Sequence, residues 1–88
     1  MKAFSGTIIE NVGLHARPAA VAVEEASKYQ SDITLYYQDR TANMKSIIQI
    51  MKIGVPAGGH IEVRCQGEDE AQAAEGILQT LQAKHIVG

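Results

Sequence analysis

Cysteine and aromatic residues are scarce in this chain. Its 88 residues include one cysteine, no tryptophan, one phenylalanine and three tyrosines. A lone Cys65 cannot form an internal disulfide, which agrees with a reducing compartment. Long apolar runs are also missing, since the stretch 47–55 is interrupted by polar residues and is far shorter than the roughly 20 residues of a membrane span. The N-terminus has no apolar core of signal-peptide length, so we expect a cytoplasmic chain without a membrane partner.

Positive charge is not in excess either. Eight Lys and Arg against ten Asp and Glu give a net charge of −2. This balance argues against a nucleic-acid partner, because no basic surplus exists to displace counterions from phosphates. An RNA-binding domain of similar topology would also need aromatic residues on its central strands for base stacking. A chain of this length has room for one compact core, so we expect a single domain over 1–88.

Hydrophobic periodicity predicts four strands and three helices. Period-two alternation indicates strands at 2–9, 32–37, 41–43 and 60–66, and helix-forming segments lie at 16–27, 47–52 and from 69 onward. The order β-α-β-β-α-β-α predicts an α+β fold. We expect an open-faced β-sandwich, in which a four-stranded antiparallel sheet is covered by three helices on one face.

The same spacing predicts which residues are buried. The expected apolar faces are those of the first helix, with Ala16, Ala19, Val23 and Ala26, and of the last, with Ala71, Ala74, Leu78 and Leu81. Asp69-x-x-Gln72 resembles a capping box at the start of the last helix. Cys65 and Ile50 are expected in the core. The spacing of Cys65, His60 and His85 fits no closed metal motif, so we expect both histidines at the surface.

The segment around His15 is the main functional signal. A helix that begins just after His15 leaves the N–H groups of Ala16 and Arg17 without intrahelical partners and directed toward the ring. These donors and the helix dipole favour an anion and disfavour a protonated ring, and the Arg17 guanidinium suits phosphate oxygens. The combination indicates a site that accepts a phosphoryl group on the His15 nitrogen. The alternative is that His15 merely caps the helix or packs on the surface.

A second signal lies at Ser46, which is a predicted N-cap of the short helix. A phosphate there would be stabilised by the helix end, although serine at this position is also an ordinary cap. The short helix has apolar side chains at nearly every position and cannot bury them all. We therefore expect some of them to form an exposed patch that transient partners bind. Its members would be Ile47, Ile48 and Met51.

The chain resembles the HPr family, the histidine-containing phosphocarriers of the bacterial sugar phosphotransferase system. The resemblance extends over essentially the whole chain. Three segments carry it: Gly13-Leu14-His15-Ala16-Arg17-Pro18-Ala19, Lys45-Ser46-Ile47 and Gln66-Gly67-Glu68-Asp69-Glu70. The family commonly has Ser or Thr at the position of Val12, Thr at Ala20, a small residue at Gln49 and Ser at Lys52. These departures alter the surface that partners would touch and suggest a restricted set of partners.

The resemblance implies a carrier rather than an autonomous enzyme, with no cofactor and no metal. Enzyme I, phosphorylated by phosphoenolpyruvate, would pass its phosphoryl group to Nδ1 of His15, and Arg17 would stabilise it in transfer. The carrier, expected to be a monomer, would then deliver the group to EIIA domains of sugar permeases. Ser46 matches a regulatory serine, which implies HPr kinase/phosphorylase and a transcriptional regulator as further partners. An alternative is a regulatory module of the Crh type, which acts through phosphorylated Ser46.

Overall fold

The predicted strands and helices form one sheet with a helical layer. The computed structural model describes residues 1–88. Its helices are α1 (Ala16–Ala26), α2 (Ile47–Ile53) and α3 (Glu70–Ala83), and its strands are β1 (Lys2–Thr7), β2 (Asp32–Tyr37), β3 (Arg40–Asn43) and β4 (His60–Gln66). The strands pair in the order β1-β4-β2-β3, and every pair is antiparallel. The open-faced α+β sandwich is therefore confirmed.

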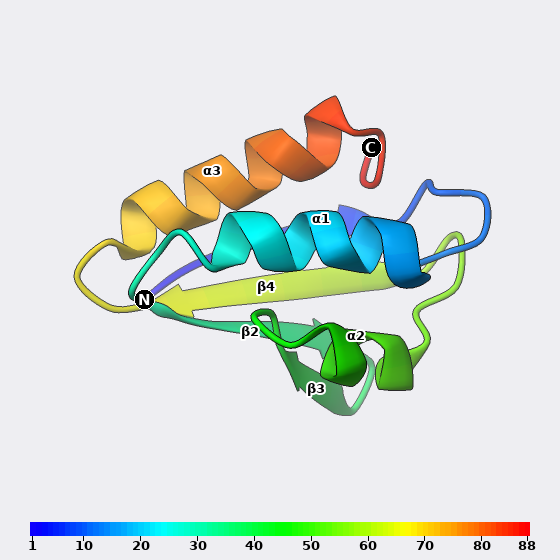
Figure 1. The fold of residues 1–88 in the computed structure, drawn as a ribbon, viewed down its shortest axis with the longest axis horizontal. Helices are drawn as coiled ribbons and strands as arrows, with labels where there is room; N and C mark the ends of the chain where they lie inside the picture. The colour runs from blue at the N-terminus through cyan, green and yellow to red at the C-terminus, as the bar shows by residue number, and fades with distance from the viewer.

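Alternation along β4 shows why the sheet has one covered face. Ile61, Val63 and Cys65 are buried, whereas Arg64 between them is exposed. All three helices cover the apolar face, and α1 lies between α2 and α3 (Figure 1). On the other face the Arg64 guanidinium stacks over the Tyr36 ring, 4.1 Å from its centroid. None of the helices has the length and apolar character that a membrane span requires.

The buried stripes of α1 and α3 match the predicted ones only in part. Ala19, Ala26 and Leu81 are buried as predicted, and Val23, Ala74 and Leu78 are partly buried against the core. Ala16 and Ala71 are exposed, and the buried residues are Pro18, Ala19, Ala22 and Ala26 in α1 and Ala73, Ile77 and Leu81 in α3. In both helices, several neighbouring faces are apolar enough to pack against the core. The small side chains of Ala22 and Ala73 face the core because α1 and α3 pack against the sheet and against each other. The predicted core positions of Ile50 and Cys65 are confirmed, since both are fully buried.

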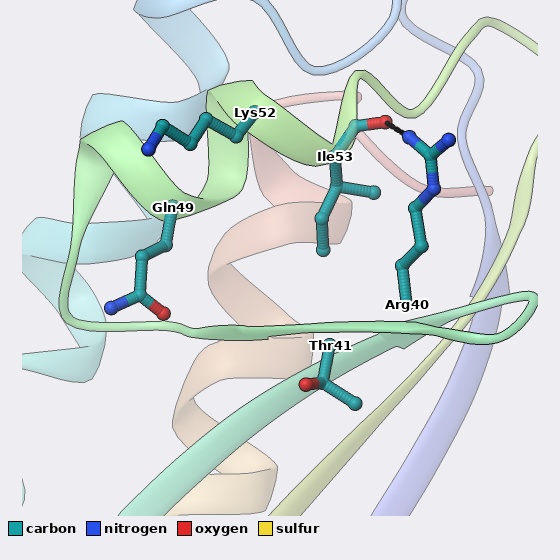
Figure 2. A pocket seen from close by; sticks show the side chains of 5 residues that line it. All are labelled: Arg40, Thr41, Gln49, Lys52 and Ile53. Carbon is teal, nitrogen blue, oxygen red and sulfur yellow. Dashed lines mark hydrogen bonds between the residues drawn. The ribbon is translucent and has the colours of Figure 1, made fainter.

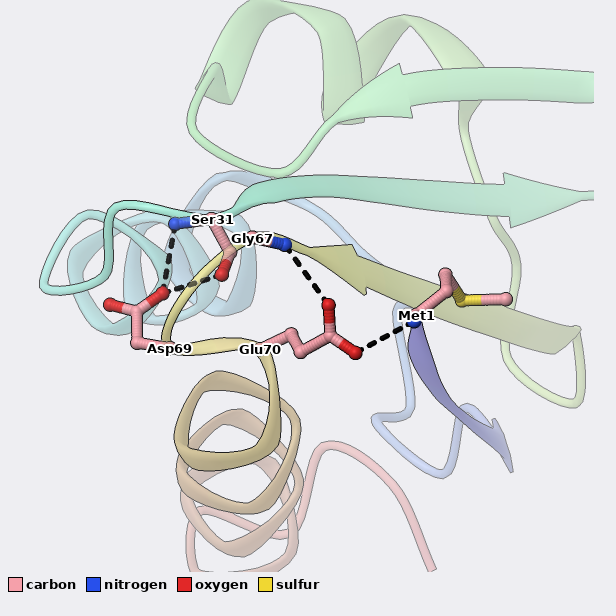
Figure 3. A network of polar contacts seen from close by, with 5 residues as sticks. All are labelled: Met1, Ser31, Gly67, Asp69 and Glu70. Carbon is pink, nitrogen blue, oxygen red and sulfur yellow. Dashed lines mark hydrogen bonds and ion pairs between the residues drawn. The ribbon is translucent and has the colours of Figure 1, made fainter.

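The predicted capping box at Asp69 is wrong. Asp69 is the N-cap residue of α3, but its side chain makes no capping bond. Instead, its carboxylate accepts hydrogen bonds from the backbone N–H and the hydroxyl of Ser31 (Figure 3). It also accepts from the backbone N–H of Gln30. Glu70 accepts from the backbone N–H of Gly67 at 3.1 Å. Asp69 thus ties the start of α3 to the segment before β2 rather than to its own helix.

The first strand is shorter than predicted, because its partner β4 begins at His60, opposite Thr7. Ile8 forms an isolated bridge with Val87, and the Ile9 N–H donates to the carbonyl of Ile86 at 2.9 Å. The C-terminal residues therefore return beside the end of β1. The β2–β3 hairpin has the predicted position, and Gln38 adopts a positive φ of 55° there in place of the glycine that such a turn favours.

Candidate functional site

His15 is the N-cap residue of α1, with an extended backbone (φ −83°, ψ −169°). Its side chain makes no capping hydrogen bond to the helix, which argues against the simple capping role considered above. Pro18 has no N–H, and the N–H groups of Ala16 and Arg17 precede the first intrahelical donor, Ala19, which bonds to the His15 carbonyl at 3.0 Å. The start of α1 thus leaves two backbone donors beside the imidazole.

The loop before His15 is held from both ends by backbone hydrogen bonds. The Gly13 N–H donates to the Glu10 carbonyl, and the Leu14 N–H donates to the Val55 carbonyl, each at 2.9 Å. Gly13 has a left-handed φ of 76°, and a Cβ there would collide with the Val55 carbonyl oxygen. Leu14 is buried in the core. A buried anchor and a glycine-dependent close approach therefore fix where the His15 ring emerges.

The two ring nitrogens of His15 have different surroundings. Nε2 is buried and has no hydrogen-bond partner, although the His15 side chain as a whole is 35% exposed. Its acidic neighbour is Oε1 of Glu10 at 3.6 Å, which is longer than a hydrogen bond. Burial of Nε2 leaves Nδ1 as the ring nitrogen that a partner can reach.

Glu10 is a site residue that the sequence reasoning missed. The same Oε1 atom accepts from Nη2 of Arg17 at 2.8 Å. The hydrogen bond from Arg17 is the main cause that holds the pKa of the Glu10 carboxyl below its usual range, and His15 contributes in the same direction, while desolvation opposes both. The signal in the sequence was an acidic residue just before a turn that leads to a histidine and an arginine. Only the fold of that turn brings the three side chains together.

Ser46 caps α2 as predicted. Its backbone is extended, and its Oγ accepts from the Gln49 N–H at 3.3 Å. The Gln49 side chain reaches back to accept from the Asn43 N–H at 2.9 Å, so it also ties the helix start to the end of β3. No hydrogen bond joins Ser46 to His15. The helix α2 has seven residues, about 10 Å of rise, and the segment after its far end meets the His15 loop.

The apolar residues of α2 divide between core and surface. Ile50 and Ile53 are buried, whereas Ile47, Ile48 and Met51 are exposed, Ile48 to 68%. Gly54, with a left-handed φ of 66°, ends the helix. Because the following Val55 bonds to Leu14, the C-terminal end of α2 and the start of α1 lie at the same side of the molecule (Figure 1). Within the exposed patch, Met51 lies toward this end of α2, whereas Ile47 and Ile48 lie in its first turn, beside Ser46.

A pocket of about 350 Å³ lies between β3 and α2 (Figure 2). Its lining side chains are Arg40, Thr41, Gln49, Lys52 and Ile53, and Arg40 donates to the Ile53 carbonyl at 3.4 Å. It contains none of the residues predicted for phosphoryl transfer. His60 and His85 are both exposed, and Cys65 lies inside, where burial raises the pKa of its thiol. The described residues contain no cluster of three or more His, Cys, Asp or Glu side chains suited to a metal ion.

Known proteins resemble this chain along nearly its full length. The family described as "PTS HPr component phosphorylation site" matches residues 3–83. Phosphocarrier protein HPr of Mycoplasma capricolum subsp. capricolum is 42% identical over 81 residues, which is 92% of this chain and 91% of that protein. A solved mycoplasma histidine-containing phosphocarrier protein superposes with a TM-score of 0.95 at 38% identity, with 98% of each chain covered. HPr-C-His from Thermoanaerobacter tengcongensis superposes at 0.90 and 36% identity, covering 97% of this chain and 96% of that one.

Proposed function

Since the chain belongs to the HPr family of phosphotransferase-system phosphocarriers, we propose that His15 is its phosphoryl acceptor. The phosphoryl group would come from Enzyme I and pass to EIIA domains of sugar permeases, in the cytosolic setting expected from the sequence. The observation that carries this assignment is the environment of the ring. Nε2 is buried and Nδ1 is not, at the start of a helix whose first N–H groups are free.

The proposed reaction is a reversible transfer of a phosphoryl group from the donor protein to Nδ1 of His15 and from there to the acceptor protein. The Nδ1 lone pair attacks phosphorus, a P–N bond forms, and the donor's bond to phosphorus breaks with its electron pair leaving on the donor. The N–H groups of Ala16 and Arg17 would stabilise the phosphoryl oxygens, and the Arg17 guanidinium would join them after leaving Glu10. The donor and acceptor proteins supply the remaining catalytic groups, so the chain acts as a carrier and not as an autonomous enzyme.

The docking surface that we propose is the patch of Ile47, Ile48 and Met51. These side chains are exposed on α2, whereas Ile50 and Ile53 on the same helix are buried. Exposed apolar side chains beside a charged site suit partners that bind and leave. A monomeric carrier would present this surface in turn to Enzyme I and to EIIA.

The test is incubation with Enzyme I and labelled phosphoenolpyruvate, followed by an acid wash. The parent should acquire an acid-labile label, as phosphohistidine does. His15→Ala should acquire none and should retain its fold, because the His15 side chain contributes little to the core. Residual acid-labile phosphate in the variant would move the acceptor elsewhere and overturn the assignment. His60→Ala is the matched control, since His60 is exposed at the start of β4.

A second candidate function is regulation through Ser46, with HPr kinase/phosphorylase and a transcriptional regulator as partners. The observation in its favour is that Ser46 is a partly exposed N-cap whose oxygen already accepts from a helix N–H. ATP and the kinase should then give an acid-stable label that Ser46→Ala abolishes. A chain that takes only this label, and none from Enzyme I, would be a regulatory module of the Crh type.

A further inference from the structure

Glu10 places one carboxylate oxygen between the two residues on which the proposed function depends. Oε1 lies 2.8 Å from Nη2 of Arg17 and 3.6 Å from Nε2 of His15. The Glu10 side chain is only 16% exposed, and the turn closed by the Gly13 N–H on the Glu10 carbonyl holds its backbone. Two side chains face the Glu10 carboxylate: the cationic guanidinium of Arg17 and the ionisable imidazole of His15.

We propose that Glu10 is a positioning residue of the carrier, which holds the neutral His15 ring in its Nε2–H tautomer and stabilises the ring when Nδ1 is phosphorylated. The role in holding the tautomer follows from the resting structure. The role in stabilising the phosphorylated ring rests on the proposed function. Glu10 lies outside the segment 13–19, which carries the sequence signal for phosphoryl transfer.

The argument for the tautomer starts from the buried nitrogen. A neutral imidazole has one N–H donor and one acceptor nitrogen, and a carboxylate can only accept. With Nε2 buried and Oε1 as its polar neighbour, a lone pair on Nε2 would face a negative charge, whereas an N–H would point a donor at it. A side-chain rotation that shortens the 3.6 Å separation to about 3 Å would make it a hydrogen bond. The Nε2–H form leaves the lone pair on Nδ1, which is the atom that must attack.

The second part concerns charge. When an Nε2–H imidazole forms a P–N bond through Nδ1, the ring acquires a positive charge while the donor takes the electron pair of the bond that breaks. The Glu10 carboxylate lies on the Nε2 edge of the ring, so it is close to that charge and on the side away from the incoming phosphoryl group. Opposite charges at this separation attract appreciably at the edge of a protein.

Arg17 completes the arrangement. In the resting chain its guanidinium is paired with Glu10, yet the side chain is 60% exposed and free to turn. When the phosphoryl group arrives, Arg17 can leave Glu10 for the phosphoryl oxygens, and the ring then takes its place as the partner of the carboxylate. One carboxylate thus has a cationic partner both before and after transfer.

The first measurement needs no phosphorylation. In protein labelled with ¹⁵N at histidine, the ring nitrogen shifts of the unphosphorylated chain at pH 8.5 or above report the tautomer of each neutral ring. We expect His15 of the parent to be mainly Nε2–H. Glu10→Gln removes the charge and adds an amide donor, so the Nδ1–H form should increase at least twofold. His60 and His85 are internal references, and Glu24→Gln, an exposed residue of α1, should leave all three rings unchanged.

The second measurement is the rate of His15 phosphorylation, with Enzyme I and separately with phosphoramidate. From phosphoramidate, phosphorus passes to Nδ1 and ammonia leaves, so no docking surface takes part. Glu10→Gln should slow both reactions about tenfold, and Glu24→Gln neither. Slowing with Enzyme I alone would make Glu10 a docking residue and overturn the proposal. Glu10→Ala, which has no amide to donate, should slow both reactions too.

The two proposals fail separately. An unchanged His15 tautomer in a folded Glu10→Gln variant overturns the role of Glu10 even if the parent is phosphorylated normally. A parent that Enzyme I does not phosphorylate overturns the carrier function, and the tautomer measurement then still decides whether Glu10 orients the ring. Backbone amide spectra of each variant establish that the fold is retained.

Discussion

The N–H of Leu14 donates a 2.9 Å hydrogen bond to the carbonyl oxygen of Val55, which joins the His15 loop to the segment that follows α2. Because of this bond, the start of α1 and the far end of α2 form one surface. A partner that docks on the exposed residues of α2 is thereby brought close to the His15 ring. The approach is possible only because Gly13 has no side chain to meet the Val55 carbonyl.

Gly13→Ala should therefore destabilise the chain and disturb the site together. The alanine Cβ meets the Val55 carbonyl oxygen, and φ at this position is 76°. We expect a loss of about 2–3 kcal/mol in the free energy of unfolding, measured by urea denaturation, and slower phosphorylation of His15. Gly58→Ala is the matched control. Gly58 has a φ of 86° but open space around it, so it should cost only about 1 kcal/mol and leave transfer unchanged.

Arg17→Ala should slow phosphorylation of His15 without abolishing it, because the backbone N–H groups at the start of α1 remain. We expect a loss of roughly tenfold or more in rate. The same variant should raise the pKa of the Glu10 carboxyl toward its usual value, since the bond from Arg17 is the main cause of its lowering. Carbon-detected titration of Glu10 measures the second effect. Arg64→Ala, on the open face of the sheet, should change neither; an unmoved Glu10 titration in Arg17→Ala would contradict the pairing.

Ser46→Asp should separate stability from function. A carboxylate at the cap of α2 can accept from the Gln49 N–H as Ser46 does and interacts well with the helix end, so the free energy of unfolding should hold or rise by about 0.5 kcal/mol. The charge lies beside Ile47 and Ile48 and must be desolvated when a partner docks, so transfer from Enzyme I should weaken. Thermal melts and transfer rates measure the two effects. Ser46→Ala should instead lose about 1 kcal/mol of stability. Equal transfer rates in the parent and Ser46→Asp would place Ser46 outside the docking surface.

Asp69→Asn should lower the Tm in a way that depends on pH. Hydrogen bonds from the Ser31 hydroxyl and from the backbone of Gln30 hold the pKa of the Asp69 carboxyl below its usual value. A carboxyl whose pKa is lower in the folded state stabilises the fold above its unfolded pKa, near 3.9, and that contribution is lost as pH falls through the folded value. The Tm of the parent should therefore exceed that of the variant at pH 7, and the gap should narrow below about pH 4. A gap that stays constant to pH 2 would show that the charge of Asp69 is not what Ser31 recognises.

Much of the site was predictable because its signals are local. The residues that follow His15 start a helix through Pro18 and a run of alanines, and a helix start carries free N–H groups wherever it occurs. Alternation likewise identified β4 and placed Cys65 in the core. In α2, where nearly every residue is apolar, Ile47, Ile48 and Met51 were expected outside and Ile50 inside, and all four lie where expected.

What the sequence by itself determined is thus the set of elements, their order and the chemistry at the start of α1, all of which follow from contacts between residues near one another in the chain. Tertiary structure alone decided that Ala22, Ala73 and Ile77 also face inward, because the neighbouring helix and the sheet select among several apolar stripes of α1 and α3. It turned Asp69 away from its own helix toward Ser31 and set the end of β1 by the start of its partner β4. It also folded Glu10 back onto Arg17 and the buried nitrogen of His15, since that approach depends on a turn anchored to Val55, which lies far along the chain.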